Sequence, residues 1–100
     1  MEFDEYQRGA RRTLNTALDP EGRLMDAAAG LAEEAGEVLG LVRKQLYQRR
    51  VIAREDVIEE LGDVLWCLAI TADTLGISFE EVAEANRQKL ARRHTDGFSG

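Results

Sequence analysis

The chain of 100 residues has little of what disulfide-rich, zinc-binding and membrane proteins need. Its single cysteine, Cys67, excludes an intrachain disulfide framework and a cysteine-rich zinc site. No apolar run approaches the roughly 20 residues that span a bilayer, and the charged N-terminus predicts no signal peptide. The net charge of −6 argues against binding of nucleic acid or of anionic membranes. We therefore expect a cytoplasmic protein with no nucleic-acid and no membrane partner.

Proline and β-branched runs are also scarce, which favours an all-α fold in a single domain, residues 1–100. Apolar side chains recur at helical spacing along the chain. They predict four helices, at about residues 3–17, 23–47, 55–75 and 79–93. Residues 19–22, DPEG, are interpreted as a turn after the first helix, and Ser78 with Glu81 predicts a capping box at the start of the last. The predicted architecture is a four-helix bundle.

One seven-residue acidic motif occurs twice. Residues 33–39 read EEAGEVL, and residues 59–65 read EELGDVL. Each copy holds two carboxylates three residues apart, which project from one face of a helix, and a short loop would make the two helices antiparallel neighbours. Gly36 and Gly62 are expected to allow a close approach of the helices at this level. The carboxylates predicted to meet are those of Glu34, Glu37, Glu60 and Asp63.

Four carboxylates that meet between helices repel one another unless a cation joins them. An oxygen-only ligand set suits Mg²⁺, with Mn²⁺ as a substitute, better than Zn²⁺. The di-iron bundles need Glu-x-x-His motifs, whereas the single histidine, His94, lies near the C-terminus. The sequence therefore predicts a magnesium site. A solvated acidic face without metal is the alternative.

The last predicted helix carries basic residues. Lys89 and Arg93 share one face of it, with Asn86 one turn earlier. Cations beside a hard metal fit a polyphosphate ligand, and a solvated basic face is the alternative interpretation. A second basic group surrounds the loop between the second and third helices: Arg43, Lys44, Arg49, Arg50 and Arg54.

Taken together, these motifs resemble the MazG-like, all-α nucleoside triphosphate pyrophosphohydrolases. The likeness covers nearly the whole chain, although Thr95 stands where relatives often carry proline. The motifs that carry it are Glu34-x-x-Glu37, Glu60-x-x-Asp63 and Asn86-x-x-Lys89-Leu90-x-x-Arg93. The resemblance implies Mg²⁺-dependent hydrolysis of a nucleoside triphosphate to the monophosphate and pyrophosphate, as house-cleaning of the nucleotide pool.

The resemblance also suggests roles for individual residues. The four motif carboxylates would hold Mg²⁺, and Glu33, beside the first pair, is the candidate catalytic residue that orients or deprotonates the attacking water. The alternative interpretation is that Glu33 is a carboxylate without a catalytic role. Asn86, Lys89 and Arg93 would contact the phosphates or the sugar. Base recognition is expected from the first helix, with Gln7 as a candidate, and from apolar residues beside the carboxylates.

The central helices carry more apolar surface than one antiparallel pair can cover. Trp66 lies in the run VLWCL and is assigned to packing or to an interface rather than to base stacking. We therefore expect oligomerisation to complete the bundle, and the resemblance suggests a homodimer or a dimer of dimers. The competing interpretation is a non-catalytic helical module for oligomerisation or for sensing metal or nucleotide.

Overall fold

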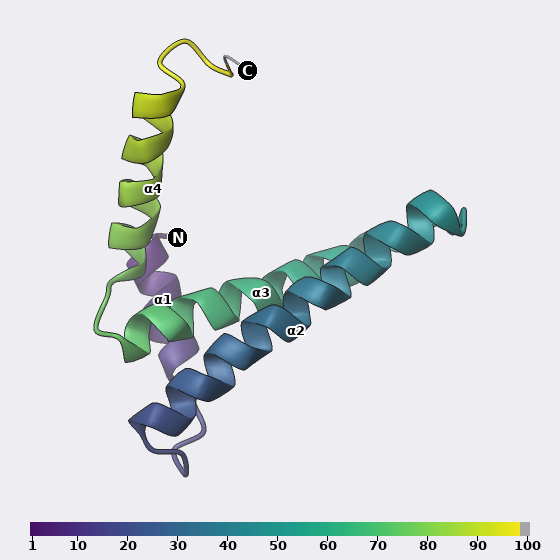
Figure 1. Ribbon diagram of the computed structural model, residues 1–100. Coiled ribbons are helices and arrows are strands. Elements are labelled where there is room, and N and C mark those ends of the chain that lie inside the picture. The colour runs from purple at the N-terminus through teal and green to yellow at the C-terminus, as the bar shows by residue number, and fades with distance from the viewer. Residues whose placement is uncertain (99–100) are drawn as a thin grey trace.

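The protein is built from four α-helices, as the computed structural model shows for residues 1–98 (Figure 1). The helices are α1 (Phe3–Arg11), α2 (Pro20–Tyr47), α3 (Arg54–Thr74) and α4 (Phe79–Arg93). Among the described residues, β-structure is limited to an isolated bridge between Thr95 and Gly97. The all-α prediction is confirmed, and residues 99 and 100 of the predicted domain lie outside this description.

Two helix boundaries differ from the prediction by three residues or more: the end of α1 and the start of α2. α1 ends at Arg11 instead of residue 17, and beyond it the Thr13 hydroxyl donates to the Ala10 carbonyl at 2.7 Å. α2 begins at Pro20, since the Asp19 carboxylate accepts the Gly22 N–H at 2.7 Å and caps the helix. Proline suits the first helical position, so Pro20 starts a helix instead of sitting in a turn.

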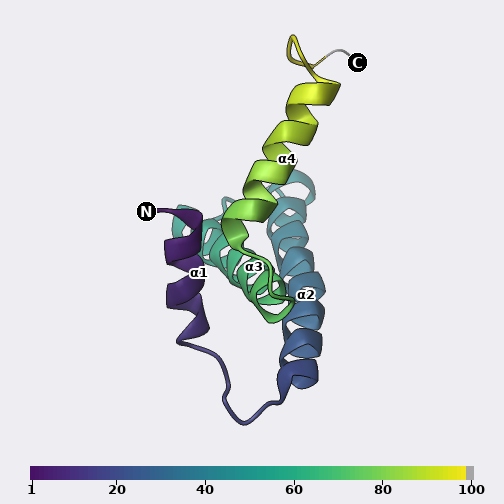
Figure 2. The ribbon, with the colours of Figure 1, turned by 90° about the vertical axis from the view of Figure 1, so that its left-hand side faces the viewer.

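The helices form an antiparallel hairpin with two appendages. α2 and α3 pack along each other, α1 lies across α3, and α4 turns away from α3 by 105° (Figures 1 and 2). The buried centre is small and lies where α1 meets the hairpin: it consists of Ala10, Ala27 and Ile70, with Tyr6, Leu14 and Trp66 packed against them.

Gln7 joins α1 to the turn between α3 and α4. Its side chain is 4% exposed. The amide nitrogen donates to the carbonyls of Ala69 (3.1 Å) and Ile77 (3.0 Å), and the amide oxygen accepts the Phe79 N–H at 3.0 Å. Arg11 forms a further link to the end of α3 through an ion pair with Asp73. Because the whole amide of Gln7 is used inside the protein, its role is structural.

No single helix among residues 1–98 has the length and apolar character needed to cross a membrane; α3 and α4 meet those criteria only when counted together across their bend.

Candidate metal centre

Three carboxylates converge between α2 and α3. Oxygens of Glu34, on α2, and of Glu60 and Asp63, on α3, lie within 4.8 Å of one another. Glu34 and Glu60 are half-buried, and Asp63 is exposed. No ion pair neutralises any of the three within residues 1–98. We call these residues the acidic cluster. It contains three of the four carboxylates that the repeated motif predicts to meet.

Glu37, the fourth predicted carboxylate, lies at the edge of the acidic cluster. It lines a cavity of 340 Å³ together with Glu60, and the lining also includes Lys44 and Glu59. The negative charge of Glu37 is close enough to raise the pKa of Glu60. Glu37 therefore adjoins the cluster through Glu60, without belonging to the group of oxygens within 4.8 Å.

The surroundings of Glu60 disfavour the charged form of its carboxylate. Burial is the largest cause that raises its pKa, followed by the charge of Glu37 and the close approach of Glu34 and Asp63. Its Oε2 atom is buried and has no hydrogen-bond partner among the described residues. A buried, unpartnered carboxylate oxygen surrounded by other carboxylates is the environment that a divalent cation relieves. The donor set therefore fits a hard cation such as Mg²⁺.

A second cavity, of 270 Å³, borders the acidic cluster toward the start of α2. Glu34 and Asp63 line it together with Asp26, Gly30, Trp66 and Cys67. A Cβ atom on Gly30 would lie 3.2 Å from the Cys67 sulfur, so this glycine permits the close packing of α2 on α3. Burial and then the charges of Glu34 and Asp63 raise the pKa of Cys67. The thiol is therefore neutral and buried, as expected for a small apolar residue.

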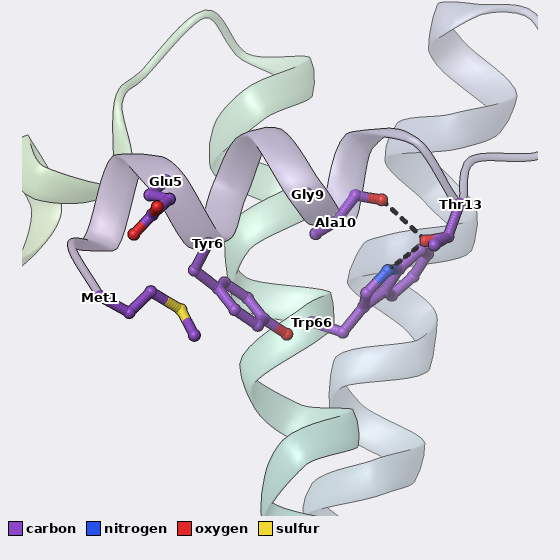
Figure 3. A pocket seen from close by; sticks show the side chains of 7 residues that line it. All are labelled: Met1, Glu5, Tyr6, Gly9, Ala10, Thr13 and Trp66. Carbon is purple, nitrogen blue, oxygen red and sulfur yellow. Dashed lines mark hydrogen bonds between the residues drawn. The ribbon is translucent and has the colours of Figure 1, made fainter.

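A larger groove lies between α1 and α3, with a volume of 670 Å³ (Figure 3). The Trp66 indole N–H donates to the Thr13 hydroxyl at 2.8 Å, which fixes the ring against the end of α1. The groove is lined by Met1, Glu5, Tyr6, Gly9, Ala10, Thr13 and Trp66. Since Trp66 also borders the cavity beside Glu34 and Asp63, the groove and the acidic cluster meet at this side chain. The charge of Asp63, after burial, raises the pKa of Tyr6, which agrees with this proximity.

The predicted substrate-binding residues are far from the acidic cluster of their own chain. Asn86, Lys89 and Arg93 are exposed on α4, which contacts α1 and α3 but, within residues 1–98, not α2. Asn86 lines a groove shared with Phe3 of α1. The predicted catalytic residue Glu33 is exposed on α2, next to Glu34. Glu33 is therefore near the acidic cluster because it precedes Glu34 in the chain. The predicted substrate-binding residues are not, because α4 extends away from the cluster.

Lys44 is the cation that the structure adds to the site. In the sequence it groups with the cations around the loop, inside the predicted helix of residues 23–47. The structure places it in α2, where it lines the cavity with Glu37 and Glu60. It follows Glu37 by two helical turns, so the two side chains share a face of α2. The spacing between Glu37 and Lys44 can be read from the sequence and would have identified Lys44 as a residue near the acidic cluster.

The fold and this centre define the class of the protein: an all-α domain whose helical hairpin carries a cluster of three carboxylates. Residues 25–98 match the MazG nucleotide pyrophosphohydrolase domain, and this match covers most of the chain. The chain therefore belongs to the MazG nucleotide pyrophosphohydrolase family. The resemblance inferred from the motifs is confirmed.

Two relatives extend the comparison. The uncharacterized protein YvdC of Bacillus subtilis (strain 168) is 39% identical over 72 residues, which cover 63% of this chain and 68% of YvdC. The Gene 37 protein of Mycobacterium phage L5 is 32% identical over 108 aligned positions, which cover 97% of this chain and 92% of the phage protein. No solved structure gives a significant match.

Proposed function

We propose that this protein hydrolyses nucleoside triphosphates to nucleoside monophosphates and pyrophosphate in a Mg²⁺-dependent reaction, with Mn²⁺ as a substitute, and so removes unwanted nucleotides. The convergence of Glu34, Glu60 and Asp63 around an unpartnered carboxylate oxygen carries this proposal, in a chain of the MazG family. The family supports the nucleotide as substrate class. The all-oxygen donor set supports a hard divalent cation.

Glu34, Glu60 and Asp63 would hold the ion, with Glu37 as the fourth ligand or as a neighbour that adjusts its charge. Bound Mg²⁺ supplies a Lewis acid that neutralises phosphate charge and makes a water molecule more acidic. Glu33 is exposed beside Glu34, where it can accept the proton of the attacking water. Lys44 borders the cavity at Glu37 and Glu60, where an ammonium group would neutralise the phosphates of the leaving pyrophosphate.

The nucleoside would lie in the groove between α1 and α3. Its volume of 670 Å³ falls in the range of small-molecule sites, and its lining is mostly apolar with few polar groups. Trp66 borders both the groove and the cavity at the acidic cluster, so a nucleotide can extend from one to the other. We therefore keep α1 as the element that recognises the base, with Tyr6 and Thr13 in place of Gln7 as the candidate residues.

A homo-oligomer, either a dimer or a tetramer, remains part of the proposal, as does a cytoplasmic location. Large apolar side chains are exposed along both hairpin helices, which supports self-association. The alternative function is a non-catalytic module for oligomerisation or for sensing metal or nucleotide. The same acidic cluster would then bind metal without turnover of nucleotide.

The decisive assay measures pyrophosphate release from a panel of ribonucleoside and deoxyribonucleoside triphosphates, with Mg²⁺ and with a chelator. Glu34→Gln and Asp63→Asn should each lower kcat by at least 100-fold, whereas Glu21→Gln, an exposed carboxylate of α2 outside the cluster, should leave it unchanged. Calorimetry would report metal binding in parallel. Metal and nucleotide binding without release of pyrophosphate from any nucleotide would refute the enzymatic proposal and favour the sensing module.

A further inference from the structure

The groove between α1 and α3 has a carboxylate at one end, and we propose that this residue, Glu5, selects nucleotides whose base is guanine. Glu5 accepts hydrogen bonds from N1–H and from the 2-amino group of the base, and Gly9 leaves the space in which the base lies. The inference rests on the proposed function, which places the nucleoside in this groove. It adds the class of base and the two residues that select it.

Three residues form a row along the groove. Glu5, Gly9 and Thr13 follow one another at intervals of four residues, which places them on one side of α1 and of the turn after it, about 6 Å apart along the axis. All three line the groove, and Figure 3 shows Tyr6 and Trp66 on either side of Gly9. The row therefore has a polar side chain at each end and an open position in its middle.

Gly9 is the open position. A Cβ atom on this residue would meet no atom within 4 Å, although the residue lies inside a helix. Glycine is among the least favourable residues inside helices, so neither helix propensity nor close packing explains its presence. The missing side chain leaves room beside the Tyr6 ring, and an aromatic side chain next to free space suits a flat, aromatic ligand. A base can therefore lie against the backbone of α1 at this position.

The nucleotide has one orientation in the groove. Trp66 borders both the groove and the cavity at the acidic cluster, so the phosphates leave the groove at the end where Thr13 holds Trp66. Glu5 precedes Thr13 by eight residues, about 12 Å along the axis. The edge of the base that is farthest from the sugar therefore meets Glu5. This distance exceeds the Debye length of about 8 Å at physiological ionic strength, so the charge of Glu5 repels the phosphates only weakly.

The Glu5 carboxylate is free to accept hydrogen bonds from a ligand. It carries the only charged side chain among the residues that line the groove. Within residues 1–98 it has no ion-pair partner, and its one hydrogen bond is from the Glu2 N–H to Oε1 at 3.3 Å. Each carboxylate oxygen has two lone pairs, so both oxygens can still accept. The distal end of the groove is therefore an acceptor for N–H groups and offers no side-chain donor from Glu5.

This acceptor discriminates between the bases. Guanine presents two adjacent donors, N1–H and the 2-amino group, which match the two oxygens of a carboxylate. Adenine and cytosine present an amino group beside an acceptor nitrogen, so only one oxygen of the carboxylate is satisfied. Uracil and thymine place a carbonyl oxygen on each side of N3–H, and these oxygens repel the carboxylate. Glu5 thus favours guanine most and uracil and thymine least.

The test compares how the wild-type protein and Glu5→Gln discriminate between bases. Pyrophosphate release in Mg²⁺ gives kcat/KM for GTP, ATP, UTP and ITP, whose base lacks only the 2-amino group of guanine. The wild type should prefer GTP by about 10-fold or more over each of the others, because hydrogen bonds to a charged group are the strong ones. Glu5→Gln keeps an acceptor for the Glu2 N–H but adds an amide donor, so the ratio of GTP to UTP should fall about 10-fold or more.

Two further variants separate selection from stability. Glu2→Gln removes a carboxylate at the same end of α1 but outside the groove lining, so it should leave the ratio of GTP to UTP unchanged. Gly9→Leu fills the open position and should raise KM for every nucleotide by about 10-fold or more. Its midpoint of thermal unfolding should not fall, since the new Cβ atom meets nothing within 4 Å and leucine favours a helix more than glycine does.

Each outcome decides the proposal. Similar kcat/KM values for the four nucleotides refute selection by Glu5 but leave the proposed function intact, as does an unchanged ratio of GTP to UTP in Glu5→Gln. A folded Gly9→Leu protein with the wild-type KM places the base elsewhere and also refutes it. If no nucleotide is hydrolysed, the proposed function fails, and calorimetric Kd values for the same nucleotides then decide the inference, because selection requires binding and not turnover. Binding of no nucleotide at all overturns both.

Discussion

Replacing Gln7 with alanine should cost a large part of the stability of the protein without weakening nucleotide binding directly. The substitution removes three hydrogen bonds and leaves the carbonyls of Ala69 and Ile77 and the N–H of Phe79 without partners at a buried junction. A buried group left unpaired costs about 1–3 kcal/mol, so the free energy of unfolding should fall by about 3 kcal/mol. This is a substantial fraction of the roughly 5–15 kcal/mol of a typical domain. The midpoint of thermal unfolding should fall by about 12 °C or more.

Urea denaturation and calorimetry measure these changes, with Gln88→Ala as the matched control. Gln88 is exposed on α4, where its amide makes one long hydrogen bond of 3.4 Å, so its loss should change the free energy of unfolding by less than about 0.5 kcal/mol. KM for nucleotide, measured well below the unfolding midpoint, should stay within twofold for both variants. A Gln7→Ala protein with nearly unchanged stability but a KM raised tenfold would refute the structural role and restore Gln7 as a base ligand.

Other predictions concern the acidic cluster and its neighbours. The raised pKa of Glu60 means that its stabilising contribution is present below its ordinary pKa and lost as the pH rises through the raised value. In chelator, Glu60→Gln should therefore unfold at a higher temperature than wild type at neutral pH, and the difference should shrink as the pH falls; equal midpoints at every pH would contradict this. Mg²⁺ at 100 times its Kd should add about 2.7 kcal/mol to the free energy of unfolding of the wild type, and much less to Glu60→Gln, as followed by calorimetry. Lys44→Ala should lower kcat/KM at least 10-fold, Lys44→Arg should restore part of it, and Arg49→Ala, beyond the end of α2, should have no effect.

The features that the sequence predicted well are local ones. The spacing of the acidic motifs along two helices was sufficient to bring Glu34, Glu60 and Asp63 together, because an antiparallel hairpin with a short loop fixes which levels face each other. The start of α4 was equally local: the Ser78 hydroxyl accepts the Glu81 N–H at 3.1 Å, as the capping motif indicated.

The features that were missed depend on contacts between distant parts of the chain. The direction of α4 is set where Gln7 binds Ile77 and Phe79, some 70 residues later, and helical periodicity contains no information about such a junction. The glycine that allows close helix packing is Gly30, whereas a Cβ atom on Gly36 or Gly62 would meet no atom within 4 Å. Whether a glycine allows two helices to pack closely depends on which residue of the other helix faces it.

The position of Trp66 gives this protein a natural optical reporter. It is the only tryptophan in the chain, and its indole is held by Thr13 between the α1–α3 groove and the cavity at the acidic cluster. Its emission therefore comes from one place that borders both compartments. Occupation of either compartment changes the surroundings of the same ring, so metal and nucleotide can be titrated separately and in either order on unlabelled protein. Fluorescence can thus reveal whether the two ligands bind independently or assist each other.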